Sequence, residues 1–292
     1  MRTTAGLGLL LLLGSCATSD TSLSEHRAEP VLLERDAGET IPWLSRVPDR
    51  ENDHESGDAF LSRTDGMSTM DRQEAAVREI LSGNIPESLR ELAPLTLESG
   101  DGATLTVWVM RDYLAIGGEG TSIRMPLSLP SARQIAREWG LYLPTPPLVD
   151  AIYEQSDLKL VPEPMPPTAE MRSNAYYKRH QASIEEQRNG RAANGLLAGH
   201  KKDLVVSTRL DARPDRVAIY GWHWEEGDPI QPLSLVHEAS YEDYSHGVRL
   251  IHPYGQLNGE WVPLVTLLDD PSWNRELSGE ASLDWERLSW RD

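Results

Sequence analysis

Residues able to do chemistry are concentrated between Gly199 and Arg249. Four of the eight histidines of the 292-residue chain lie in this window, together with carboxylates, lysines, serines and arginines. Histidine takes up and releases protons near neutral pH, so this composition predicts a site for acid–base chemistry. The candidate catalytic residues are His200, Lys202, Asp203, Asp243, Ser245, His246 and Arg249.

In a metal-free hydrolase or lyase, His200 and His246 are the expected proton carriers, because each adjoins a glycine where a ligand can approach the backbone. Neighbouring residues of a strand point to opposite faces, so Ser245 as a nucleophile would pair with His200 rather than with His246. The two segments are therefore expected to meet at one cleft that both rings face. The supporting groups are a carboxylate that orients an imidazole (Asp203 or Asp243) and a cation that stabilises an oxyanion (Lys201, Lys202 or Arg249).

A zinc site is the second interpretation of the same window. His237, Asp243 and His246 have a spacing that could supply metal ligands, and His223 or His200 could complete a three-ligand site with one open position. The chain has no His-Glu-x-x-His motif. The sequence leaves the cofactor open between none and zinc.

Binding without catalysis is the third interpretation. In Trp222-His223-Trp224 the two indole rings share a face if the backbone is extended, and coplanar rings can stack on sugar. The chain has nine tryptophans and nine tyrosines against one phenylalanine, a composition that suits binding surfaces. The candidate binding residues are Trp222, His223, Trp224, Tyr241 and Tyr244, which predict a glycan- or cell-wall-binding protein.

The first residues form a targeting segment rather than part of the fold. An apolar run follows Arg2 and is too short to span a bilayer. It ends in Leu13-Gly14-Ser15-Cys16, which resembles the lipobox of bacterial lipoproteins. The resemblance implies removal of a signal peptide, residues 1–15, lipidation of Cys16, and, because Asp does not follow the cysteine, an outer-membrane location.

The overall charge limits the expected partners. The formal charge is −18 and the pI about 4.8, which argue against nucleic acid or an anionic membrane surface. The expected partners are the membrane, through the lipid anchor, and a cell-envelope polysaccharide or peptidoglycan.

The elements that must position the site follow an acidic segment. Residues 16–66 lack periodicity and predict a disordered tether. Residues 67–292 predict one α+β domain, with a helical N-terminal block and a mixed or antiparallel sheet that carries the C-terminal site.

Expected helices are 68–81, a short one from Pro86, 128–139, one after Thr145, and 169–188. Expected strands are 104–110, 112–117, 122–127, 204–208, 216–220 and 248–251. Residues 261–268 fit a strand or a short helix, and the acidic tail an irregular strap.

Six runs resemble a family of bacterial secreted proteins whose function is uncharacterised. They are Asp112-Tyr-Leu-Ala-Ile-Gly117, Leu143-Pro-Thr145, Gly199-His-Lys-Lys-Asp203, Val217-Ala-Ile-Tyr-Gly-Trp-His223, Pro229-Ile-Gln-Pro232 and Asp243-Tyr-Ser-His-Gly-Val-Arg249. The resemblance covers about residues 90–270 and implies one extracytoplasmic domain. It implies no catalytic residue.

Overall fold

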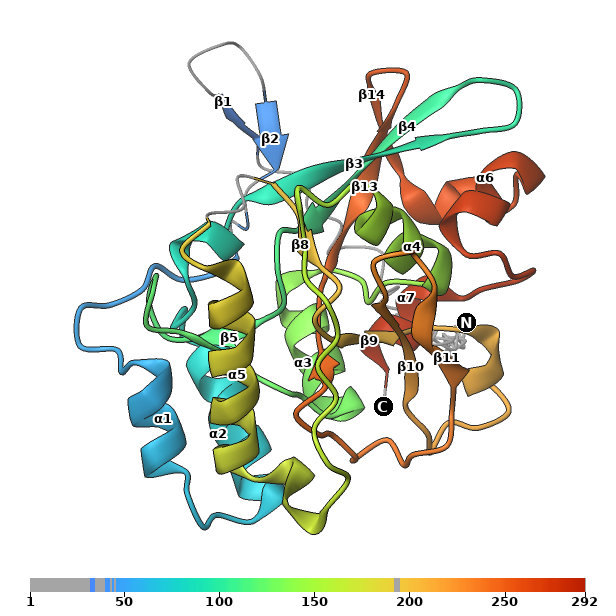
Figure 1. Cartoon of the computed structure of the whole chain (residues 1–292). Coiled ribbons are helices and arrows are strands. Elements are labelled where there is room, and N and C mark those ends of the chain that lie inside the picture. Colours follow the sequence, from blue (N-terminus) through green and yellow to red (C-terminus); the bar gives the residue numbers. More distant parts are fainter. Residues whose placement is uncertain (1–31, 35–39, 43, 45, 192–194, 292) are drawn as a thin grey trace, which may run out of the picture.

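The computed structural model describes residues 32–34, 40–42, 44, 46–191 and 195–291 (Figure 1). The predicted signal peptide and the lipidation site at Cys16 lie outside these residues. None of the helices in the described part is both long and apolar enough to cross a membrane. The predicted α+β class is confirmed, and one main hydrophobic core extends from Leu44 to Leu288.

The helices form largely where the sequence predicts them. Their bounds are α1 Gly57–Arg63, α2 Thr69–Leu81, α3 Leu129–Trp139, α4 Pro146–Glu154, α5 Asn174–Arg188, α6 Pro271–Leu277 and α7 Trp285–Trp290. Helix α3 shows the local reasons. The Ser128 side chain accepts a hydrogen bond from the Ser131 amide at the start, and Gly140 ends the helix in the left-handed conformation. Figure 1 shows α1, α2 and α5 together on one side of the molecule.

Two four-stranded sheets provide the framework. One is antiparallel in the order β14-β13-β4-β3, with β3 Leu92–Glu98, β4 Thr104–Met110, β13 Ile251–Leu257 and β14 Glu260–Pro263. The other is mixed, in the order β11-β10-β9-β12, with β9 Lys202–Val205, β10 Ala218–His223, β11 Pro229–Ser234 and β12 His246–Gly247. In the second sheet only the β9–β12 pair, among the described residues, is parallel.

Short two-stranded sheets and single 3-10 turns make up the remaining regular structure of the described residues. The pairs are β1 Leu32–Glu34 with β2 Thr40–Pro42, β5 Ala115–Ile116 with β6 Ile123–Arg124, and β7 Leu158–Lys159 with β8 Leu197–Ala198. The 3-10 turns are η2 Glu87–Leu89, η3 Ala169–Arg172, η4 Thr208–Leu210 and η5 Leu264–Leu267. Residues 261–268 thus hold both predicted elements, the end of β14 and then η5.

The expected boundary of the tether at residue 66 needs correction. Residues 46–66 are ordered, and α1 forms inside them. Val47, Phe60 and Leu61 are buried in the main core, which offsets the cost of ordering this charged segment. The hydrophobic residues are widely spaced between charges, and for that reason composition alone indicated disorder.

The acidic tail is also more regular than expected. Helices α6 and α7 replace the predicted irregular strap. Asp270 and Asp284 cap them by accepting hydrogen bonds from the amides of Ser272 and Arg287. Trp273 and Trp285 are buried, and the Trp285 indole donates to the Leu143 carbonyl at 2.7 Å, so the tail packs on the chain next to α4.

Candidate functional site

The segments around Lys202 and His246, which hold most of the candidate residues, lie side by side where β9 pairs with β12. His246 is in register with Lys202, and Gly247 with Asp203. The Lys202 amide also donates to the Ser245 carbonyl at 2.7 Å. Successive residues of a strand face opposite ways, so this pairing divides the candidate residues between two faces.

The Asp203 face carries the Asp112 cluster: Asp112, Tyr113, Arg124, His200, Asp203 and Arg249. His200 is buried, and its Nε2 donates to Asp112 Oδ1 at 3.1 Å. The Tyr113 ring lies 4.9 Å from the His200 ring, and its hydroxyl donates to Asp203 Oδ2 at 2.7 Å. A Cβ on Gly247 would come within 2.5 Å of the Tyr113 ring, so only glycine fits there. Tyr113, rather than a ligand, occupies the space that this glycine leaves open.

Arg249 holds this cluster together. Its guanidinium donates to the carbonyls of Met110 and Leu197 at 2.8 and 2.6 Å, and it lies over the Tyr113 ring at 4.6 Å. Its Nε is 4.0 Å from Asp203 Oδ1. Arg249 is fully buried and both of its terminal nitrogens donate to backbone carbonyls, which favours a structural role for it over the expected stabilisation of an oxyanion.

Burial controls the protonation of this face. It lowers the pKa of His200 to about 4 and that of Lys201 to about 7, and it raises that of Asp203 to about 6. Burial alone would also raise the pKa of Asp112, but Arg124 and His200 together bring it well below its ordinary value. Lys201 donates to the Tyr244 carbonyl at 2.7 Å. At neutral pH His200 is therefore neutral and Asp112 ionised.

The opposite face carries the His246 cluster: Lys202, Trp222, Tyr241, Asp243 and His246. Asp243 Oδ1 accepts from the amide and hydroxyl of Ser245 at 2.8 and 2.6 Å, and Oδ2 accepts from the Tyr241 hydroxyl at 3.0 Å. The Ser245 hydroxyl therefore has a carboxylate partner rather than His200. Burial lowers the pKa of His246 to about 4, and neither ring nitrogen has a hydrogen-bond partner in the described part of the chain.

His200 and His246 are thus buried in different clusters, and the expected single cleft with both rings facing it is not what the structure shows. The three expected zinc ligands, His237, Asp243 and His246, lie around Tyr241 but contact its ring and hydroxyl rather than one another. His237 stacks on Tyr241 with ring centroids 4.0 Å apart. Across residues 46–191 and 195–291, no three His, Cys, Asp or Glu side chains are arranged to hold a metal ion.

The expected aromatic shelf is not formed as a pair. Trp222 is 3% exposed and Trp224 42% exposed, so a sugar could stack on only one of them. Trp222 has a positive φ of 60°, and the backbone there is not extended as the shelf required. His223 is buried, and its Nε2 is 2.8 Å from Asp150 Oδ1. Tyr244 is buried against Tyr176 and His180.

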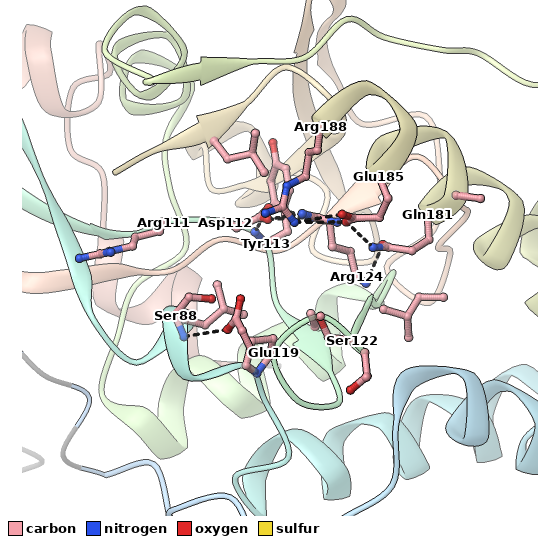
Figure 2. Close-up of a pocket in the computed structure, with 18 of the residues that line it drawn as sticks. Ser88, Arg111, Asp112, Tyr113, Glu119, Ser122, Arg124, Gln181, Glu185 and Arg188 are labelled. Atoms are coloured by element: carbon pink, nitrogen blue, oxygen red, sulfur yellow. Dashed lines mark hydrogen bonds and ion pairs between the residues drawn. The ribbon is translucent and has the colours of Figure 1, made fainter. Parts of the chain in front are cut away.

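A cavity of about 450 Å³ opens beside the Asp112 cluster (Figure 2). Its walls come from α5, from the chain after β4 and from the β5–β6 turn. Figure 2 shows Asp112, Tyr113 and Glu185 on one side and Ser88, Glu119 and Ser122 on the other. The polar lining residues are Asp58, Ser88, Arg111, Asp112, Tyr113, Glu119, Thr121, Ser122, Arg124, Lys178, Gln181, Glu185 and Arg188.

Both signs of charge line this cavity. Arg124 joins Asp112, at 2.9 Å, to Glu185, at 2.8 Å. Arg188 adds a second cation on Glu185 at 3.1 Å, and Lys178 pairs with Asp58 at 2.9 Å. Glu119 accepts a hydrogen bond from the Ser88 amide at 3.3 Å but forms no ion pair within the described residues. The cavity therefore offers fixed charges and one carboxylate available to a cation.

None of these cavity residues was a candidate from the sequence. One signal was present: Lys178, Gln181, Glu185 and Arg188 recur at the spacing of one helix face. Such a stripe is also what any solvated helix shows. Comparison of the chain with protein-family models, with curated proteins and with solved structures finds no match, so the function must be inferred from the geometry itself.

Proposed function

We propose that this chain is a lipid-anchored outer-membrane protein that binds a peptide-bearing segment of a cell-envelope polymer, such as peptidoglycan, in the cavity beside α5. The cavity carries this proposal. Its volume of about 450 Å³ is in the range of small-ligand sites, and its walls present fixed charges of both signs. A stem peptide carries ammonium and carboxylate groups, and an uncharged glycan would use neither.

The charge state of the lining favours binding over acid–base catalysis. A general acid or base works best with a pKa near the working pH. Asp112, the lining carboxylate that contacts His200, has a pKa well below its ordinary value, and the pKa of His200 is about 4. A hydrolase or lyase acting on the same polymer remains the second candidate, because the His200–Asp112 contact links an imidazole to the cavity wall.

Glu119→Gln is expected to weaken binding of a soluble muropeptide about tenfold, the size expected for one charge-assisted hydrogen bond. Glu119 is exposed and forms no ion pair among the described residues, and a glutamine oxygen can still accept from the Ser88 amide, so the fold should not change. Calorimetric titration of the full chain in detergent measures the effect. Glu98→Gln, an exposed carboxylate at the end of β3, is the matched control and should bind as the wild type does.

Two results would contradict this proposal. One is equal affinity of the Glu119→Gln and wild-type chains, and the other is equal affinity of the wild type for muropeptide and for peptide-free glycan. Product analysis of the same mixtures tests the second candidate, since cleaved muropeptide would establish a hydrolase or lyase.

Cys16→Ser tests the anchor. The serine hydroxyl is not the thiol that the lipidation reaction modifies, and each buried CH₂ of an acyl chain contributes about 0.8 kcal/mol to membrane affinity. We expect the variant to leave the outer-membrane fraction or to accumulate unprocessed. Fractionation with immunodetection measures this, and a variant that still floats with outer membranes would refute the lipoprotein assignment.

A further inference from the structure

The His246 cluster has features of a second ligand site, separate from the cavity. It lies on the opposite face of the β9–β12 pair from the Asp112 cluster. The register places Lys202 of β9 between His246 of β12 and Gly221 of β10, with Trp222 next in the chain. Lys202, Tyr241 and His237 are half-buried, so the cluster reaches the surface along this edge while His246 lies beneath it.

Three buried nitrogen atoms of this cluster have unmet hydrogen-bonding capacity. Both ring nitrogens of His246 and the indole nitrogen of Trp222 have no hydrogen-bond partner among the described residues. Buried polar atoms are nearly always paired, and an exception calls for an explanation. A neutral imidazole and an indole each supply one N–H donor, so at least two donors are available here.

Lys202 adds a cation that is not in direct contact with a carboxylate of the described residues. Its ammonium lies over the Trp222 ring, 5.2 Å from the centroid, and it forms no ion pair in the part of the chain that the structure describes. Asp243 is the carboxylate that interacts with it electrostatically. Asp243 also accepts hydrogen bonds from Ser245 and Tyr241, and it is not within ion-pair distance of the Lys202 ammonium. An unpaired lysine at a half-buried position is unexpected in a chain of formal charge −18.

The backbone at this point is also strained. Trp222 has φ 60°, a conformation that costs free energy for a bulky residue, and it follows Gly221 at φ 99°. The register of β10 against β11 shifts between Ile219 and Gly221. This irregularity sets the Trp222 ring beneath the Lys202 ammonium, where the two form one side of the cluster.

We propose that the His246 cluster binds a carboxylate group of a small ligand or of a polymer end, with Lys202, which lies over the Trp222 ring, as its counter-ion and the N–H group of His246 as a hydrogen-bond donor. A monoanion fits better than a dianion such as phosphate, because the ionised Asp243 repels a ligand in proportion to its negative charge and Lys202 supplies one positive charge to offset it. The proposal is independent of ligand binding in the cavity, which uses other residues.

Acetate is the probe that tests this site. In the full chain with ¹⁵N-labelled histidines, in detergent at pH 7, acetate should shift the imidazole signals of one histidine saturably, and His246→Gln should remove those signals. Acetamide, the neutral isostere, should produce no saturable shift. The comparison of acetate with acetamide is made on the wild-type chain, and the His246→Gln variant serves only to assign the signals.

Lys202→Gln should weaken acetate binding at least tenfold, whereas Lys202→Arg should retain it. Lys159→Gln is the matched control, because Lys159 also lies over an aromatic ring, 5.0 Å from the Tyr153 centroid, but outside the cluster. Glu119→Gln should not affect acetate binding. The proposal fails if acetate gives no saturable shift of His246, if acetamide acts equally, or if folded Lys202→Gln binds acetate as the wild type does.

Discussion

Arg249→Ala is expected to lower the free energy of unfolding by about 3–5 kcal/mol, the usual cost of removing one partner from a buried charge pair. The change would leave Asp203 buried without its cation and the carbonyls of Met110 and Leu197 without their donor. It would also remove the guanidinium that packs on Tyr113. Urea unfolding followed by tryptophan fluorescence measures the loss.

Two comparisons make this prediction specific. Arg78→Ala removes an arginine that is 69% exposed and 3.8 Å from Glu74, so it should cost less than about 1 kcal/mol. The double variant Arg249→Met with Asp203→Asn removes both charges and should be more stable than Arg249→Met alone. Equal stability of these two variants would show that Arg249 does not act through Asp203.

The fold was predictable where local signals agree. Ser128, Ala132, Ile135, Trp139 and Gly140 give capping, periodicity and termination for α3, and the helix has those bounds. Alternation likewise identified β4. Strand β3 was missed, although Leu92, Leu95 and Leu97 are buried in it, because Pro94 interrupts the apparent run. Its register with β4 comes from tertiary packing, which no window of sequence contains.

The site was predictable only in part, for a related reason. The concentration of polar residues in two segments predicted that the segments around Lys202 and His246 meet, and they do so in the pairing of β9 with β12. It could not divide them between two faces, because that division depends on the register of β9 with β12. Nor could it find the partner of His200, since Asp112 lies 88 residues earlier in the chain. Contacts of this separation are set by the fold.

Acidification from pH 6.5 to 4 is expected to destabilise the protein strongly, because buried histidines must take up protons. Burial lowers the pKa of His200, His246 and His252 to about 4 in the folded chain, against an ordinary value of 6.5. Each contribution is fully present above pH 6.5 and is lost as the pH falls through about 4. At about 1.4 kcal/mol per pH unit, each histidine accounts for about 3 kcal/mol.

Asp203 acts in the opposite direction. Its folded pKa of about 6 is above the ordinary 3.8, so its contribution is present below pH 3.8 and is lost as the pH rises through about 6. On acidification, protonation of Asp203 therefore adds about 3 kcal/mol to the free energy of unfolding. When the gain from Asp203 is subtracted from the losses of the three histidines, the free energy of unfolding falls by about 6 kcal/mol. This is a large share of the 5–15 kcal/mol that stabilises a typical domain. His180, whose pKa is well below 6.5, adds to the loss.

Two variants distinguish the histidine contribution from that of Asp203, because they change the pH dependence of the unfolding free energy in opposite directions. His252 belongs to neither cluster, so His252→Asn should flatten the dependence of unfolding free energy on pH by about 1.4 kcal/mol per unit between pH 4 and 6.5. Asp203→Asn should steepen it by a similar amount between pH 4 and 6, because the compensating carboxylate is gone. Urea unfolding at half-unit pH intervals measures both slopes. A wild-type stability that stays level on acidification, or variant slopes that change in the same direction, would mean that these buried groups do not govern the acid response.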